Sequence, residues 1–168
     1  MSEPKGFYRI RIRKEALKFS AAHMTVFADG TKENLHGHNY RTVLKLEFSH
    51  FSLAEMLPFS EIKKAIREIC AEWDEKVLLP SLCPFLDVKS DSDESMEVTV
   101  CGKRYVFPRE EVVMLPIDNV TTESLAKIFT ERVASALSKS ALEQAGVRSI
   151  EGVVEEMLGQ GASYVLTF

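Results

Sequence analysis

The chain has 168 residues, 45% of them hydrophobic and 27% charged, which suffices for one domain with its own core. Its net charge of −4 argues against nucleic acid as a main partner, because phosphate binding requires a basic face. No apolar run approaches the roughly 20 residues that a membrane span needs, so a membrane partner is not expected either.

The N-terminal segment and the cysteines indicate a cytoplasmic protein. MSEPKGFYRI lacks the apolar stretch of a secretory signal. Cys70, Cys83 and Cys101 are odd in number and widely spaced, so reduced thiols are expected rather than a disulfide framework.

The first half of the chain predicts two strands and a helix. Residues 7–13, FYRIRIR, and residues 40–48 alternate between apolar and polar side chains, as half-buried strands do. After Pro58 the period becomes helical, with Ser60 as the expected N-cap. The stripe of that helix consists of Ile62, Ile66, Ile69 and Trp73.

The middle of the chain predicts a loop, a hairpin and a second helix. Residues 90–95, SDSDES, are polar, and residues 97–108 form a hairpin that turns at Cys101-Gly102-Lys103. Residues 118–137 start the second helix, with Thr121 or Asn119 as its N-cap.

The end of the chain predicts two further strands, residues 148–157 and 163–168, around a Gly159–Gly161 turn, with Gly146 closing the preceding helix. This order of strands and helices along the chain predicts an α+β fold in a single domain, 1–168. In it, an antiparallel four-stranded sheet carries two helices on one face, together with the extra hairpin. Its unpaired sheet edges favour oligomerisation.

Three of the four histidines fall within sixteen positions: His23 in FSAAHM, and His36 and His38 in NLHGHNY. Residues i and i+2 of an extended chain point to the same side, so His36 and His38 can reach one point. His23, placed just beyond the first strand, joins them if the two strands pair. Three imidazoles with an open fourth position are typical of a catalytic zinc site. His50 lacks such neighbours and is expected at a solvated strand end.

FSAAH, LHGHNY leading a strand, TTESLA opening a helix, and VEEM in a late strand together resemble the 6-pyruvoyl-tetrahydropterin synthase and 6-carboxytetrahydropterin synthase family. The resemblance covers most of the chain in the right order, with residues 87–117 as an apparent insertion. That insertion is expected to lengthen the sheet or to rim the mouth of the site.

The resemblance implies a tunnelling fold (T-fold), whose subunits join into trimeric barrels that stack as a homo-hexamer with sites between subunits. It implies Zn²⁺ on His23, His36 and His38. It also implies a dihydropterin substrate, typically 7,8-dihydroneopterin triphosphate, on whose side chain zinc acts as a Lewis acid.

The resemblance also implies a glutamate that accepts hydrogen bonds from the pterin edge. Glu156 matches that position in VVEEM, and Glu155 is the alternative in the neighbouring register, on the other face of the strand. Thr121, Thr122 and Glu123 are expected to add pterin contacts, although they also suit simple helix capping.

The chain departs from the family in its acid–base residues. Lys32 stands where the usual cysteine precedes HGH, whereas Glu33 gives Glu-x-x-HGH. That pattern resembles a subclass that cleaves the side chain to 6-hydroxymethyl-dihydropterin, a folate precursor. A solvent-exposed loop carboxylate is an equally weighted interpretation of Glu33.

The second departure lies at the end of the first helix, where the family has an Asp-His pair. Asp74 is kept and Glu75 replaces the histidine. The two carboxylates are either acid–base groups of another kind or plain helix-terminal charges. Cys70 is expected in the core, and Cys83 and Cys101 lie far along the chain from the histidines, so a catalytic role is not expected of either.

Two functions remain open from the sequence. The first is a zinc-dependent lyase on 7,8-dihydroneopterin triphosphate, with Glu33, Asp74 and Glu75 as catalytic candidates and side-chain cleavage favoured over pyruvoyl or carboxy products. The second is a pterin-binding paralogue that lacks turnover, consistent with the missing cysteine and histidine.

Overall fold

The structure is a computed structural model that describes residues 6–50 and 56–168. Residues 1–5 of MSEPKGFYRI, on which the signal-sequence prediction rests in part, lie outside the described residues, as does segment 51–55 of the predicted 1–168 domain. The bounds of that domain, and the status of residues 87–117 as an insertion, stay predictions.

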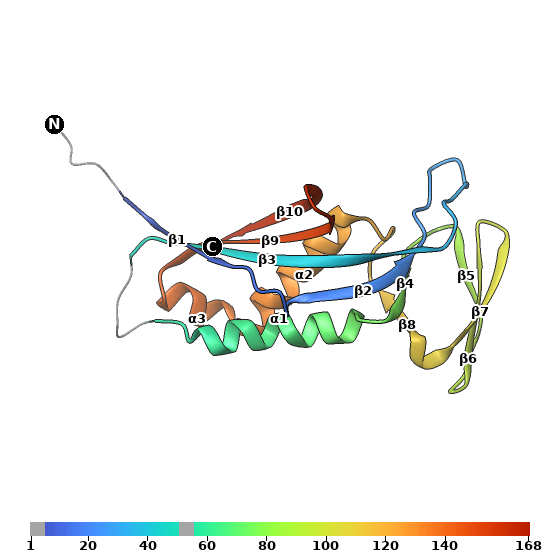
Figure 1. Cartoon of the computed structure of the whole chain (residues 1–168), viewed down its shortest axis with the longest axis horizontal. Coiled ribbons are helices and arrows are strands. Elements are labelled where there is room, and N and C mark those ends of the chain that lie inside the picture. Colours follow the sequence, from blue (N-terminus) through green and yellow to red (C-terminus); the bar gives the residue numbers. More distant parts are fainter. Residues whose placement is uncertain (1–5, 51–55) are drawn as a thin grey trace.

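In the described part of the chain, strands form a large sheet and a small one (Figure 1). The large sheet runs β10-β9-β3-β2-β4-β8, and β1 also pairs with β3. Its strands are β1 (Tyr8–Ile12), β2 (Lys18–His23), β3 (His36–Phe48), β4 (Lys76–Pro80), β8 (Val112–Leu115), β9 (Val147–Met157) and β10 (Gln160–Thr167). The small sheet, at one end of the molecule, consists of β5 (Leu86–Asp91), β6 (Ser95–Val100) and β7 (Lys103–Pro108).

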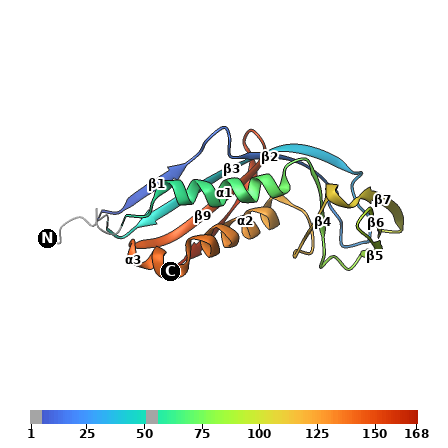
Figure 2. The ribbon, with the colours of Figure 1, turned by 90° about the horizontal axis from the view of Figure 1, so that it is seen from below.

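The helices cover one face of the large sheet, where α1 and α2 lie side by side (Figure 2). They are α1 (Phe59–Trp73), α2 (Thr122–Leu137) and the short α3 (Lys139–Gln144). A 3-10 turn, η2 (Arg109–Glu111), follows β7 and contacts the small sheet. Both long helices turn apolar stripes toward the sheet, and that burial drives the packing of the two layers. Among the described helices, none has the length and apolar character to cross a membrane.

The core lies between this helical layer and the alternating apolar residues of β3 and β9. Leu44, Leu46, Ile150 and Val154 are fully buried there, and Trp73 at the end of α1 packs against the same cluster. Tight packing at β9 depends on Gly152, which lies directly under α2. The α+β T-fold class predicted from the sequence is confirmed.

The sheet differs from the predicted four antiparallel strands. β4 pairs in parallel with β2, and β8 pairs in parallel with β4, so both extend the sheet beyond the prediction. KVLLP and VVML are short, continuous apolar runs without alternation, and such runs carry no periodicity signal that separates strand from helix.

Lys18–His23 also forms a strand, β2, which was not predicted. His23 is therefore the last residue of a strand, whereas the prediction placed it just beyond one. Its Ser and Ala residues give a weak strand signal. The predicted hairpin at 97–108 is confirmed, but the loop predicted at 90–95 was wrong at its ends, because Ser90 and Asp91 belong to β5 and Ser95 to β6.

Two of the predicted helix boundaries were wrong. The residue that precedes α1 is Pro58, without a side-chain cap, so Ser60 lies inside the helix. Gly146, with a φ of +71°, follows α3 and not α2. The Thr121 cap is confirmed, since its side chain accepts a hydrogen bond from the Ser124 amide.

We expect Gly152→Ala to destabilise the fold. A Cβ at this position would overlap Thr130 Oγ1 and come within 2.8 Å of Phe129 Cδ1, both buried on α2. Overpacking of this kind costs about 1–3 kcal/mol. Chemical denaturation measures the loss, with Gly6→Ala as the control, because a Cβ there meets nothing within 4 Å. Equal stability of the two variants would contradict the packing described.

Candidate functional site

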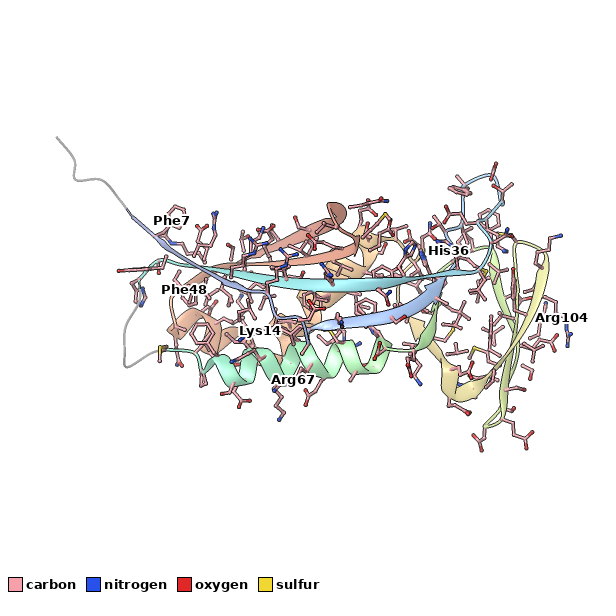
Figure 3. All side chains as sticks on the ribbon, viewed as in Figure 1. Phe7, Lys14, His36, Phe48, Arg67 and Arg104 are labelled. Carbon is pink, nitrogen blue, oxygen red and sulfur yellow. The ribbon has the colours of Figure 1, made fainter. Side chains whose placement is uncertain are left out.

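Three imidazoles meet where β2 ends and β3 begins. In the β2–β3 register, His23 lies opposite His36, and Ala21 lies opposite His38, so all three rings project from one face of the sheet. Their ring centroids are 4.6–5.4 Å apart, and one nitrogen of each lies within 4.8 Å of the others. Figure 3 shows His36 at this end of β3, near the small sheet.

Hydrogen bonds orient two of these rings. Nδ1 of His23 lies 2.8 Å from the Val120 carbonyl, and Nδ1 of His36 lies 2.8 Å from the Asn34 carbonyl. A carbonyl only accepts, so each Nδ1 carries the proton, and each Nε2 is left with a lone pair.

The cluster fits a metal ion. Nε2 of His23 is buried and has no hydrogen-bond partner among the described residues, which is costly for a polar atom unless a further ligand binds it. Burial also lowers the pKa of His23, so the ring stays neutral, as a metal ligand must be. Three imidazole nitrogens from one face suit a divalent transition-metal ion.

A cluster of three aromatic side chains packs next to the histidines. Phe19 and Tyr40 stack at 4.8 Å between ring centroids, and Trp73 meets Phe19 edge-on at 5.3 Å. Tyr40 in turn lies 5.7 Å from the ring of His38 and 6.1 Å from that of His23. These residues are almost fully buried, so the imidazoles rest on a rigid base.

Two carboxylates approach the histidines from opposite sides. Glu33 Oε2 lies 4.0 Å from His36 Nε2, and Glu156 Oε2 lies 3.9 Å from His38 Nε2. Val154 pairs with Thr42, whose side chain is on the histidine face, so Glu156 is on that face too, whereas Glu155 points to the other side. There Glu155 lies 3.8 Å from Arg13.

The start of α2 closes the site. The Asn119 side chain accepts from the Val26 amide and donates to the Val26 carbonyl, which ties this end of α2 to the segment after β2. Thr121, Thr122 and Glu123 thereby line the same cavity as the histidines. Hydrogen bonds, first to its own backbone amide and then to Thr121, lower the pKa of Glu123.

The resulting cavity has a volume of about 330 Å³ and brings together eight of the ten site residues named from the sequence. Thr25, Met157 and Gln160 also line it, and no sequence pattern indicated them. Gln160 donates to Glu156 Oε1 at 2.6 Å from the β9–β10 turn. The glycines on either side of Gln160 predict only that the chain turns there. The contact between the Gln160 side-chain amide and Glu156 depends on how β9 and β10 pair.

Asp74 and Glu75 do not line this cavity. Asp74 Oδ1 accepts from the Ser20 amide at 2.7 Å, and the Glu75 amide donates to the Ser20 carbonyl at 2.6 Å. Asp74 lines a separate cavity with Ser20, Asn39 and Arg41, whose side chains are on the sheet face opposite to the histidines. In this chain the two acidic residues join the end of α1 to β2, and neither is among the residues that line the histidine cavity.

The cysteines also lie outside the cavity. Cys70 is buried in the main core, as predicted, and burial raises its pKa to about 11. Cys83 belongs to a second apolar cluster, beneath the small sheet. Cys101 lies at the β6–β7 turn, where its Sγ is 3.7 Å from the Thr31 carbonyl. The described thiols are unpaired.

Comparisons with known proteins identify relatives of this chain. The sequence model of the family described as 6-pyruvoyl tetrahydropterin synthase matches residues 11–165. A Methanocaldococcus jannaschii protein named "Putative 6-carboxy-5,6,7,8-tetrahydropterin synthase" is 34% identical over 149 residues, which are 88% of this chain and 89% of that protein.

Solved structures share the fold. The 6-pyruvoyl tetrahydropterin synthase of Plasmodium vivax superimposes with a TM-score of 0.88 at 24% identity, covering 97% of this chain and 99% of the other. A variant of that enzyme, in which a catalytic glutamate is replaced by alanine, gives a TM-score of 0.88 at 23% identity over the same shares.

We expect His36→Ala to weaken binding of divalent zinc at least tenfold, because it removes one of three converging nitrogens. Isothermal titration of metal-stripped protein measures the affinity. His50→Ala is the matched control, since His50 lies beyond the end of β3 and outside the cluster. Unchanged zinc affinity in His36→Ala would contradict the assigned ligand set.

Proposed function

Because this chain belongs to the 6-pyruvoyl tetrahydropterin synthase family, we propose that it is a zinc-dependent lyase acting on the side chain of 7,8-dihydroneopterin triphosphate. The observation that carries the proposal is the cavity in which three histidines, Glu33 and Glu156 converge. Within this activity, cleavage to 6-hydroxymethyl-dihydropterin is the favoured outcome.

His23, His36 and His38 would hold the zinc ion through their Nε2 atoms. Zinc bound there supplies Lewis-acid polarisation of the substrate's side-chain hydroxyls, which lowers their pKa without redox chemistry. The neutral state of His23 and the hydrogen bonds of its Nδ1 and of His36 Nδ1 favour this coordination.

Glu33 is the proposed base. Its carboxylate lies 4.0 Å from His36 Nε2, so it reaches a hydroxyl held at the cluster. Removal of the proton from the hydroxyl on the second side-chain carbon breaks the bond between the first and second carbons, and the ring accepts the electron pair. Return of that proton to the first carbon gives 6-hydroxymethyl-dihydropterin and a phosphorylated two-carbon aldehyde.

The catalytic glutamate of the Plasmodium vivax enzyme supports this assignment, because that protein shares the fold and the family of this chain. The alternative role for Glu33 is that of a solvated loop charge. Its side chain is 46% exposed and borders the cavity, which suits a group that must exchange protons with substrate.

Glu156 is the proposed pterin anchor. A carboxylate accepts two parallel hydrogen bonds from the N–H pair of the pterin's guanidine-like edge. Gln160 holds Oε1 of Glu156, which fixes the orientation of the carboxylate. Thr121, Thr122 and Glu123 form the opposite wall and would contact the ring.

Asp74 and Glu75 can act on this substrate only if another copy of the chain brings them to the cavity. The proposed homo-hexamer of stacked trimers, with sites between subunits, provides such copies, and the unpaired edges of β10 and β8 in the described chain suit edge-to-edge pairing. Reduced cysteines support the cytoplasm as the proposed location.

Product analysis tests the proposed activity. We expect zinc-loaded protein to convert 7,8-dihydroneopterin triphosphate into a pterin with the mass of 6-hydroxymethyl-dihydropterin. We expect Glu33→Gln to lower kcat at least 100-fold, since general-base catalysis contributes about 10²–10⁴, while zinc content stays the same. Glu68→Gln, an exposed carboxylate on α1, is the control.

A pyruvoyl or carboxy product would overturn the assignment of side-chain cleavage. It would still mean that the protein catalyses a reaction typical of the synthase family. Tight pterin binding with no product would support the rival function, a pterin-binding paralogue without turnover. Full activity of Glu33→Gln would remove Glu33 from the mechanism.

We expect Glu156→Gln to raise the dissociation constant for 7,8-dihydroneopterin about tenfold or more, because a hydrogen bond to a charged group is lost. Fluorescence titration of the pterin measures this effect. Glu155→Gln is the matched control, since it makes the same change one residue away on the opposite face of β9. A larger loss in Glu155→Gln would mean that the anchor had been assigned to the wrong face.

A further inference from the structure

A second cavity, of about 560 Å³, lies on the other side of the segment that carries Glu33. Lys32 and Asn34 line it from this segment, and Lys103, Arg104 and Tyr105 line it from the β6–β7 turn and β7. We call it the cationic pocket, because three cations and no carboxylate contribute to its lining.

The charge of the two cavities is opposite. The histidine cavity contains Glu33, Glu123 and Glu156 and no lysine or arginine. A triphosphate carries several negative charges and is repelled by those carboxylates. Charge complementarity therefore favours the pterin ring and its hydroxyls in the histidine cavity, and the phosphates in the cationic pocket.

The two cavities are neighbours. Lys32 and Glu33 are consecutive residues, and Lys32 forms a β-bridge with Val26, so the segment is extended there and its side chains alternate in direction. If the side chain of the substrate begins beside Glu33, it reaches Lys32 with its phosphates by passing around this one strand, a distance of about 5 Å.

Lys32 and Lys103 differ in burial and in their contacts. Lys32 is half-buried; its ammonium donates to the Glu33 carbonyl at 3.0 Å and lies 5.1 Å above the ring of Tyr105. Both contacts hold the charge at the pocket. The ammonium of Lys103 makes no hydrogen bond or ion pair with any described residue, so it is available to an anion.

Arg104 contributes less. Its guanidinium forms two hydrogen bonds of 2.8 Å to the carboxylate of Glu97, which neutralises much of its charge. Figure 3 shows Arg104 at the outer end of the molecule, consistent with a place at the pocket's rim. The nearby carboxylate of Asp29 is engaged by the amide and hydroxyl of Thr31.

The small sheet is what forms this pocket. It lies beside the segment between β2 and β3 in both ribbon views (Figures 1 and 2). Cys101 Sγ is 3.7 Å from the Thr31 carbonyl, and a Cβ on Gly30 would come within 3.3 Å of Phe85. Sheet and segment are therefore packed together, and Lys103 is fixed relative to Lys32.

We propose that the cationic pocket binds the triphosphate of the pterin substrate, with Lys32 and Lys103 as its phosphate ligands. This inference rests on the proposed function for the identity of the substrate. It assigns residues 86–108 a role in substrate selection: they would favour a triphosphate ester over the dephosphorylated pterin.

The test compares two pterins in the zinc-loaded protein. We expect Lys103→Gln to raise KM for 7,8-dihydroneopterin triphosphate about tenfold, the loss expected for one charged hydrogen bond. KM for unphosphorylated 7,8-dihydroneopterin should stay unchanged. Lys89→Gln is the matched control, because it removes the same charge from the same small sheet, where Lys89 pairs with Asp87 outside the pocket.

Binding of inorganic triphosphate, measured by titration calorimetry, keeps the inference testable if neither pterin is turned over. Weaker binding in Lys103→Gln than in Lys89→Gln would then support the anion site and refute only the lyase. Equal effects of Lys103→Gln on both pterins, or no effect on either triphosphate ligand, would overturn the inference. Where the pterins are turned over, an effect on inorganic triphosphate without an effect on KM for 7,8-dihydroneopterin triphosphate would also overturn it, because it would indicate a site for free polyphosphate.

Discussion

The register between β2 and β3 is the constraint on which the site depends. Because His23 lies opposite His36 and Ala21 opposite His38, three imidazoles project from one face within reach of a single ion. A shift of one residue would turn the side chains of one strand to the other face and disperse the cluster. Phe19 pairs with Tyr40 in the same ladder, so the packing of the core and the geometry of the histidines are fixed by the same hydrogen bonds.

The same alternation separates the carboxylates by role. Glu156 shares the histidine face of β9, while Glu155 shares the opposite face with Arg41, its neighbour on β3. Asp74 likewise binds backbone on the side away from the histidines. Sequence proximity to a motif therefore predicts little about participation in a site, whereas the parity of a residue on its strand predicts much.

The alternation of side chains along a strand explains how much of the fold and of the site could be predicted. The histidine cluster follows from motif spacing and period-two alternation, whereas Glu33, Glu156 and the T-fold follow from the family resemblance that the motifs carry. β4 and β8 could not be recognised, because short apolar runs without alternation lack a distinguishing period. The contact of Gln160 with Glu156, and the approach of the small sheet to Lys32, depend on tertiary packing that no local pattern encodes.

The chemistry proposed for Glu33 is consistent with the number of proton-transfer groups available. Glu156 is held by Gln160 and suited to the pterin edge, and Glu123 keeps a lowered pKa at the helix start, so Glu33 remains as the base among the carboxylates of this cavity. Side-chain cleavage needs one proton taken from oxygen and one given to carbon, and a single carboxylate can do both in turn. Conversion to a pyruvoyl product moves protons at two adjacent carbons and calls for a second group. Within one chain, this cavity therefore has a single carboxylate available for proton transfer, which favours cleavage. A neighbouring copy that contributes Asp74 or Glu75 would remove this preference.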